Sequence, residues 1–100
     1  MSMTNFPSHG APRPSSSQVC ATLLGQHIQA ARLWDGRPLE EIAPLAGLTV
    51  PEWKGIEAGQ APDTWEHICL IAAVLHLGRS WMPYLSRLWI KARLPWPENS

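Results

Sequence analysis

One stretch, PLEEIAPLAGLTVPEWKGIEAG at residues 38–59, constrains what this chain can fold into more than any other. Proline is favoured in the first turn of a helix, so Pro38 predicts a helix start. Gly47 predicts the end of that helix, in the left-handed conformation that glycine allows. The apolar residues at helical spacing, expected to face inward, are Leu39, Ile42 and Leu45. Pro44 is unfavourable inside such a helix because it removes a backbone hydrogen bond.

The second half of the stretch predicts another short helix that ends at Gly59. Thr49 and Glu52 have the spacing of a capping box, in which a hydroxyl and a carboxylate satisfy exposed backbone donors at a helix start. Trp53 and Ile56 follow, three residues apart, and are expected to face inward. The whole stretch therefore predicts a helix-turn-helix, a unit whose second helix can enter the major groove of DNA.

Three further helices are predicted around this unit, and no strand-like alternation of useful length occurs, so the expected fold class is all-α. The first helix is expected from about Gln18 to Trp34, with Ser17 as its N-cap. The fourth begins at Asp63 or Thr64, where Asp63 and Glu66 have the spacing of a second capping box, and it ends at Leu77-Gly78. The fifth spans Trp81 to Arg93.

Length and composition divide the chain into a core and two tails. One hundred residues with 45% apolar content fit one small domain. Residues 1–17 are rich in proline and serine and predict a disordered tail, and residues 95–100 form a second tail. The helix-turn-helix domain is placed at residues 18–78, and residues 79–94 are expected to form a C-terminal helix.

Several classes of function lack their signatures in this sequence. No nucleophile triad, glycine-rich phosphate loop or paired-carboxylate cleft is recognisable, so we do not expect an enzyme. Cys20 and Cys69 lie far apart and form no ligand spacing with the histidines, so neither a disulfide nor a metal site is expected. No cofactor or small-molecule ligand is indicated. The longest apolar run, residues 68–75, is too short to span a bilayer, and we expect a cytoplasmic protein without membrane contact.

Tryptophan is unusually frequent, with six residues in this length. More large apolar side chains are present than one small core readily hides, which favours a protein–protein contact. The candidate residues for a homodimer contact lie in the predicted last helix: Trp81, Leu85, Leu88 and Trp89. The alternative is that this helix folds back and completes the core of a monomer.

Short motifs follow one another in a fixed order between Leu24 and Gly78. They are Ile28 with Arg32, Glu40-Glu41-Ile42-Ala43, Ala46-Gly47 with Thr49, Ile56-Glu57 with Gly59, and Trp65-Glu66 with Ile68, Ile71, Ala72 and Leu75. In order and spacing these motifs resemble the lambda-repressor-like family, also called the XRE or Cro/cI-type family. The resemblance covers a little over half of the chain. It implies a five-helix DNA-binding domain with an extra C-terminal helix, and an ion pair between Arg32 and Glu57.

The resemblance also implies where DNA would be contacted. The candidates at the start of the third helix and just after it are Thr49, Val50, Pro51, Lys54, Gly55 and Gln60. Val50 could touch a thymine methyl group, and Lys54 a guanine edge or a phosphate. The function that follows is a sequence-specific transcriptional regulator that binds double-stranded DNA, as a homodimer on a palindromic site.

Charge favours a different function. Six acidic residues and one lysine occupy residues 38–66, whereas DNA affinity comes largely from basic side chains that displace counterions. The basic residues near the C-terminus either flank a DNA backbone or form the polar face of the last helix. The alternative function is therefore a protein-interaction module that has the helix-turn-helix fold without DNA readout.

Overall fold

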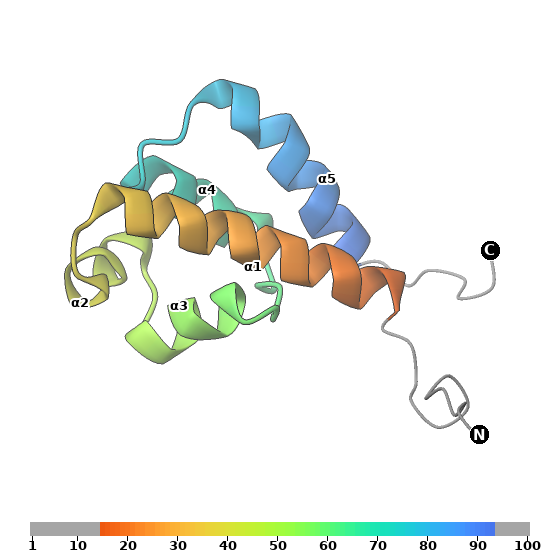
Figure 1. Cartoon of the computed structure of the whole chain (residues 1–100), viewed down its shortest axis with the longest axis horizontal. Coiled ribbons are helices and arrows are strands. Elements are labelled where there is room, and N and C mark those ends of the chain that lie inside the picture. Colours follow the sequence, from red (N-terminus) through yellow and green to blue (C-terminus); the bar gives the residue numbers. More distant parts are fainter. Residues whose placement is uncertain (1–14, 94–100) are drawn as a thin grey trace, which may run out of the picture.

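The computed structural model describes residues 15–93, and the regular elements of this part of the chain are all helices. Its elements are α1 (Ser16–Asp35), α2 (Leu39–Ile42), η2 (Pro44–Ala46), α3 (Val50–Glu57), α4 (Trp65–Val74), η3 (Arg79–Trp81) and α5 (Met82–Arg93), where η marks a 3₁₀ helix. The prediction of an all-α fold is confirmed. In Figure 1, α1 crosses the middle of the molecule, with α3 on one side of it and α5 on the other.

α1 begins earlier than predicted. Its N-cap is Ser15, whose hydroxyl accepts the backbone N–H of Gln18, so Ser17 is a helical residue and not the cap. The predicted tail at residues 1–17 is therefore wrong for residues 15–17. Its remainder at 1–14, and the predicted tail at 95–100, lie outside the described residues. Gly36 ends α1 with a φ of 84°, and its N–H bonds the carbonyl of Arg32.

Pro44 divides the predicted second helix into two pieces. α2 ends at Ile42, and a 3₁₀ turn, η2, begins at Pro44, because the proline cannot donate the hydrogen bond that would continue an α-helix. The change of pitch rotates Leu45 outward, so the expectation that Leu45 faces inward is wrong: it is 59% exposed. Gly47 ends the turn at a φ of 73°, as predicted, and the N–H of Leu48 bonds the carbonyl of Ala43.

α4 differs from prediction at both ends, and the last helix begins at Met82, because Trp81 belongs to the preceding 3₁₀ turn. The second capping box is absent: Thr64 is the N-cap of α4 without a side-chain cap bond, and Asp63 instead lies 3.4 Å from Arg93 of α5. α4 stops at Val74 because His76 adopts a left-handed φ of 57°. The N–H of Leu77 bonds the carbonyl of Ala72, which closes the helix without a glycine.

The core lies where α1, α3, α4 and α5 meet. Trp53 is fully buried at its centre. The other large side chains that are fully buried are Leu24, Ile28, Ile42, Ile68, Ile71 and Leu85. Trp65 is only half-buried; its ring lies 5.8 Å from that of Trp89, whose Nε1 donates to the Pro62 carbonyl. Among the described helices, none is long and apolar enough to cross a membrane.

Candidate nucleic-acid interface

α3 begins at the capping box that the sequence predicts. The Thr49 hydroxyl accepts the backbone N–H of Glu52 at 3.2 Å, and the Glu52 carboxylate accepts the backbone N–H of Thr49 at 2.8 Å. These bonds satisfy two backbone donors that a helix start leaves free. The bond from the Thr49 backbone lowers the pKa of Glu52, with a further lowering from the Thr49 side chain. α3 is thus a defined helix of eight residues.

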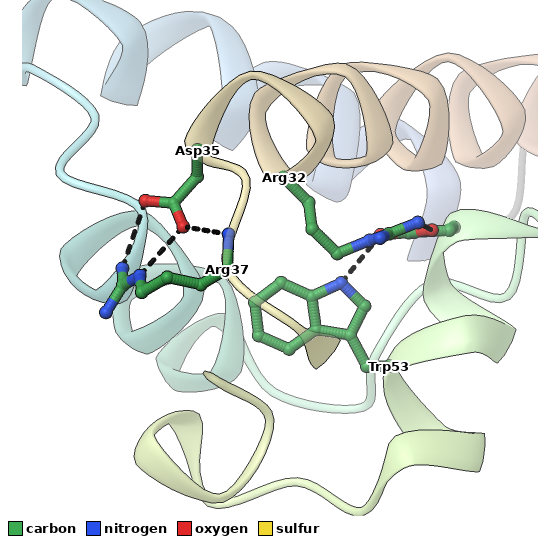
Figure 2. Close-up of polar contacts among 5 residues, drawn as sticks. Arg32, Asp35, Arg37 and Trp53 are labelled. Atoms are coloured by element: carbon green, nitrogen blue, oxygen red, sulfur yellow. Dashed lines mark hydrogen bonds and ion pairs between the residues drawn. The ribbon is translucent and has the colours of Figure 1, made fainter. Parts of the chain in front are cut away.

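A polar cluster fastens the inner side of α3 to α1. The Arg32 guanidinium donates to both oxygens of the Glu57 carboxylate, at 2.6 Å from Nε and 3.0 Å from Nη2. Trp53 Nε1 donates to the same carboxylate at 2.7 Å. Figure 2 shows Arg32 reaching from α1 toward the indole of Trp53. The structure thus brings together the two residues of the expected ion pair. The Glu57 side chain is 5% exposed, and its carboxylate raises the pKa of Arg32.

Two glycines let the backbones of α1 and α3 approach closely. A Cβ atom on Gly25 of α1 would lie 2.3 Å from the Ile56 carbonyl oxygen, a distance that no packed structure accommodates. At the other glycine, Gly59, φ is 106° and the carbonyl accepts a bond from Gln18 Nε2 at 3.4 Å. The polar cluster and this close contact together hold α3 in one position against α1.

The candidate DNA-contacting residues lie along the solvent side of α3 and just beyond it. Lys54 and Pro51 are exposed, and so is Thr49, although its hydroxyl already serves as the cap. Val50 is half-buried because it packs against the core, which leaves only part of its side chain accessible. Gln60 is exposed and folds back over Gly55: a Cβ atom there would lie 2.6 Å from Gln60 Oε1. Lys54, Gly55 and Gln60 are therefore neighbours.

The surroundings of these residues carry mostly negative charge. The exposed acidic residues on α2, α3, α4 and the loop before α4 are Glu40, Glu41, Glu52, Asp63 and Glu66. Glu52 stands at the N-terminal end of α3, where the helix would otherwise attract a phosphate. Its carboxylate is ionised at neutral pH, as an unshifted glutamate would also be. Arg93, beside Asp63, is a basic side chain that α5 brings to this edge.

A shallow depression lies between α3 and the start of α4. Its volume is about 260 Å³, and its lining includes Glu52, Ile56, Gln60, Asp63 and His67. Two carboxylates at the rim and an isoleucine at the base suit a long side chain with an apolar stem and a positive end. Such a side chain belongs to a protein or peptide, not to DNA.

The predicted dimer contact is wrong for two of its four residues. Leu85 is 1% exposed and Leu88 7%, because α5 folds back onto α1 and α4 and these leucines complete the core of a single copy. Trp89 is half-buried against Trp65. Of the four, Trp81 alone remains exposed.

Two contacts of α1 were not predicted from the sequence. His27 Nε2 lies 3.0 Å from the Tyr84 hydroxyl of α5, a contact between residues far apart in the chain. Gly25 stands inside a helical pattern, where a glycine is costly unless close packing requires it. Gly25 was therefore the feature of the sequence from which a close α1–α3 contact could have been predicted. Among residues 15–93, no group of three or more histidine, cysteine or acidic side chains is placed to hold a metal ion.

Comparison with known proteins found no relative of this chain. Protein-family models, curated proteins and solved structures were compared with the chain, and none of them matches it.

Proposed function

We propose that this protein is a sequence-specific DNA-binding transcriptional regulator that reads the major groove with the exposed side of α3. The observation that carries the proposal is the presentation of α3: a capped helix that follows a tight turn, with its inner side fastened to α1 and its outer side open to solvent. A reading helix needs such a fixed position, because base contacts depend on sub-ångström placement.

The proposal assigns the contacts as follows. Lys54 meets a guanine edge or a phosphate, and Gln60 with the backbone around Gly59 meets phosphate oxygens. In a homodimer, two copies of α3 would lie about 34 Å apart, over successive major grooves of a palindromic site. The lambda-repressor-like arrangement and a cytoplasmic location belong to the same proposal.

The charges around α3 predict an unusual binding profile for a DNA-binding protein. Each phosphate neutralised by a lysine or arginine adds about 0.9 to the slope of log affinity against log salt. Lys54 stands among several exposed carboxylates, so binding to random DNA should be weak and its salt slope shallow. Discrimination between sequences then depends on contacts to base edges.

The test compares two basic residues that lie on different helices. Affinity for a short random-sequence duplex is measured by fluorescence anisotropy over a series of salt concentrations. Lys54→Ala should weaken binding and lower the slope by about one per bound α3 helix. The control is Arg87→Ala, an exposed residue of α5, which should change neither. An unchanged slope in Lys54→Ala would contradict the assignment of α3 as the DNA-contacting element.

A second candidate function is a protein-interaction module, and the acidic depression between α3 and α4 favours it. A basic peptide segment would place a lysine or arginine between Glu52 and Asp63. The double variant Glu52→Gln/Asp63→Asn separates the two functions. It should strengthen DNA binding, since two negative charges near the duplex are removed, whereas it should weaken the binding of an arginine-containing peptide.

A further inference from the structure

The helix α1 has a surface that neither the core nor the α3 contact uses. No charged residue occurs between Ser16 and Ala31, and the one basic residue of its last turn is Arg32. Val19 and Leu23 are exposed large apolar side chains on this helix. They stand at four-residue spacing from one another and from His27, so the three residues share one side of the helix.

The same side of the molecule continues onto η3 and the start of α5. Trp81 is 44% exposed, and its ring lies 5.9 Å from that of His27. Tyr84 is 37% exposed, and its hydroxyl forms a hydrogen bond with His27. A partly aromatic surface without acidic residues, lysine or arginine thus extends over α1, η3 and α5. We name it the α1–α5 face: Val19, Leu23, His27, Ala30, Trp34, Trp81 and Tyr84.

At one end of this face an open cavity of about 700 Å³ lies beside a prominent side chain. The cavity is lined mainly by apolar residues of α1, by the turn after α4 and by α5, among them Ile28, Ala31, Leu75, Leu77 and Leu85. Trp34 stands at the rim of the cavity and is 92% exposed. Exposing an apolar side chain of that size to water is unfavourable relative to burying it.

We propose that a second copy of this chain covers the α1–α5 face, with Trp34 of each copy inserted into the cavity of the other. A two-fold axis turns one surface onto its own image, so the surface must be complementary to itself. The α1–α5 face meets that condition because it contains no acidic residue, lysine or arginine, and the Asp35 carboxylate that lines the cavity is paired with Arg37 of its own copy. The shape of the face is also complementary to itself, since each copy has both a projecting tryptophan and a cavity that can receive one.

The size of the face sets the expected strength of association. Trp34, Trp81 and Tyr84 expose on the order of 400 Å² of side-chain surface per copy, given about 150–250 Å² for an aromatic residue. Two copies with their aliphatic neighbours then come close to the lower limit of specific interfaces, about 1,200 Å² in total. We therefore expect a dimer with a dissociation constant in the micromolar range.

The α1–α5 face is separate from the exposed side of α3, since α3 and α5 lie on opposite sides of α1 (Figure 1). Self-association and DNA binding can therefore fail independently. A monomer that still selects a DNA sequence would overturn the dimer alone, and a dimer without DNA affinity would overturn the DNA-binding function alone.

The test is sedimentation equilibrium of the full chain over a wide range of protein concentrations. The wild type should dimerise, and Trp34→Ala should raise the dissociation constant at least about tenfold, because each tryptophan is a central anchor of the contact. Leu45→Ala is the control: Leu45 is similarly exposed, at 59%, but lies on η2 away from the cavity, and its removal should leave association unchanged. A wild type that stays monomeric, or an unchanged constant in Trp34→Ala, would overturn the proposal.

A pair of variants tests the reciprocal geometry. Ala30 is exposed at the rim of the cavity, so Ala30→Glu should fold normally and should block the recess with a charge. Trp34→Ala retains the recess and lacks the projecting ring, whereas Ala30→Glu retains the ring. An equimolar mixture can form one intact contact and should associate more tightly than either variant alone. A mixture that associates no better than the two variants would contradict insertion of Trp34 into the partner's cavity.

Discussion

α1 meets its two neighbours in opposite ways. Toward α3 the contact is close and polar, with a glycine at the crossing and a buried carboxylate that receives three hydrogen bonds. Toward the start of α5 the contact is open, with a cavity and one exposed bond between His27 and Tyr84. The difference indicates that the position of α3 is specified within one copy; the open side is the one on which we propose that a second copy packs.

The largest effect is expected at the glycine of the close contact. Gly25→Ala places a Cβ atom against a backbone carbonyl, which cannot move as a side chain can. We expect a loss of about 4 kcal/mol, above the usual range of about 1–3 kcal/mol for overpacking. Urea unfolding measures it, with Gln26→Ala at the next, exposed position as the control. A cost below about 1 kcal/mol would show that the α1–α3 contact is not tight.

A slightly smaller effect is expected at the ion pair. Arg32→Ala leaves the Glu57 carboxylate buried with Trp53 Nε1 as its remaining described partner. Since an unpaired buried charge is costly, we expect a loss of about 3 kcal/mol. Thermal unfolding measures it, and a shift of only a degree or two would contradict a structural role. The double variant Arg32→Ala/Glu57→Gln should recover part of the loss, because the buried charge is removed as well.

The stability of the fold should depend on pH through Asp35, which lines the cavity beside Trp34. Hydrogen bonds from the Arg37 guanidinium lower the pKa of Asp35 (Figure 2). Arg37 Nη2 also donates to the Val74 carbonyl of α4. A carboxyl group whose pKa is lower in the folded state stabilises the fold above its unfolded pKa, and that contribution is lost as the pH falls through its folded pKa.

The melting temperature of the wild type should therefore fall between about pH 5 and about pH 2, where carboxyl groups titrate. Asp35→Asn should fall less over this range, whereas Glu66→Gln, which changes an exposed carboxylate of α4, should follow the wild type. Parallel curves for wild type and Asp35→Asn would show that the bond to Arg37 does not stabilise the fold.

The smallest loss of stability is expected when the bond between His27 and Tyr84 is removed. Tyr84→Phe removes the hydroxyl that bonds His27 and keeps the ring. Because the bond is exposed, its loss should cost about 0.5–1 kcal/mol at most. A loss as large as that in Arg32→Ala would remove the contrast between the two sides of α1. Urea unfolding of both variants under the same conditions makes the comparison.

Local features were predictable from the sequence. The capping box of Thr49 and Glu52 joins atoms three residues apart, and the left-handed Gly47 follows from the residue type, so both could be read without knowledge of the fold. The second capping box failed for the opposite reason. Asp63 lies beside Arg93, a residue thirty positions away, and a local sequence pattern cannot predict such a distant partner.

The functional surfaces were harder to predict. Helical spacing places Trp81, Leu85 and Leu88 on one side of the predicted last helix, but it does not say how far α1 covers that side. In the structure α1 covers the two leucines and leaves Trp81 exposed. The cavity beside Trp34 arises from three separate segments, so no single stretch of sequence contains it. By contrast, the scarcity of basic residues around α3 was visible in the sequence, and the structure leaves five of the six acidic residues of that stretch exposed, with Glu57 buried against Arg32.

The measurement that tests the central claim most directly is selection of fragmented genomic DNA on the purified protein at low salt, followed by sequencing. If α3 reads DNA, one short, two-fold symmetric site is enriched, and Lys54→Ala loses that enrichment while Leu45→Ala retains it. No enrichment even at low salt, where the attraction between charges is strongest, would contradict DNA reading by α3. The acidic depression beside α3 would then be tested as a site for basic peptides.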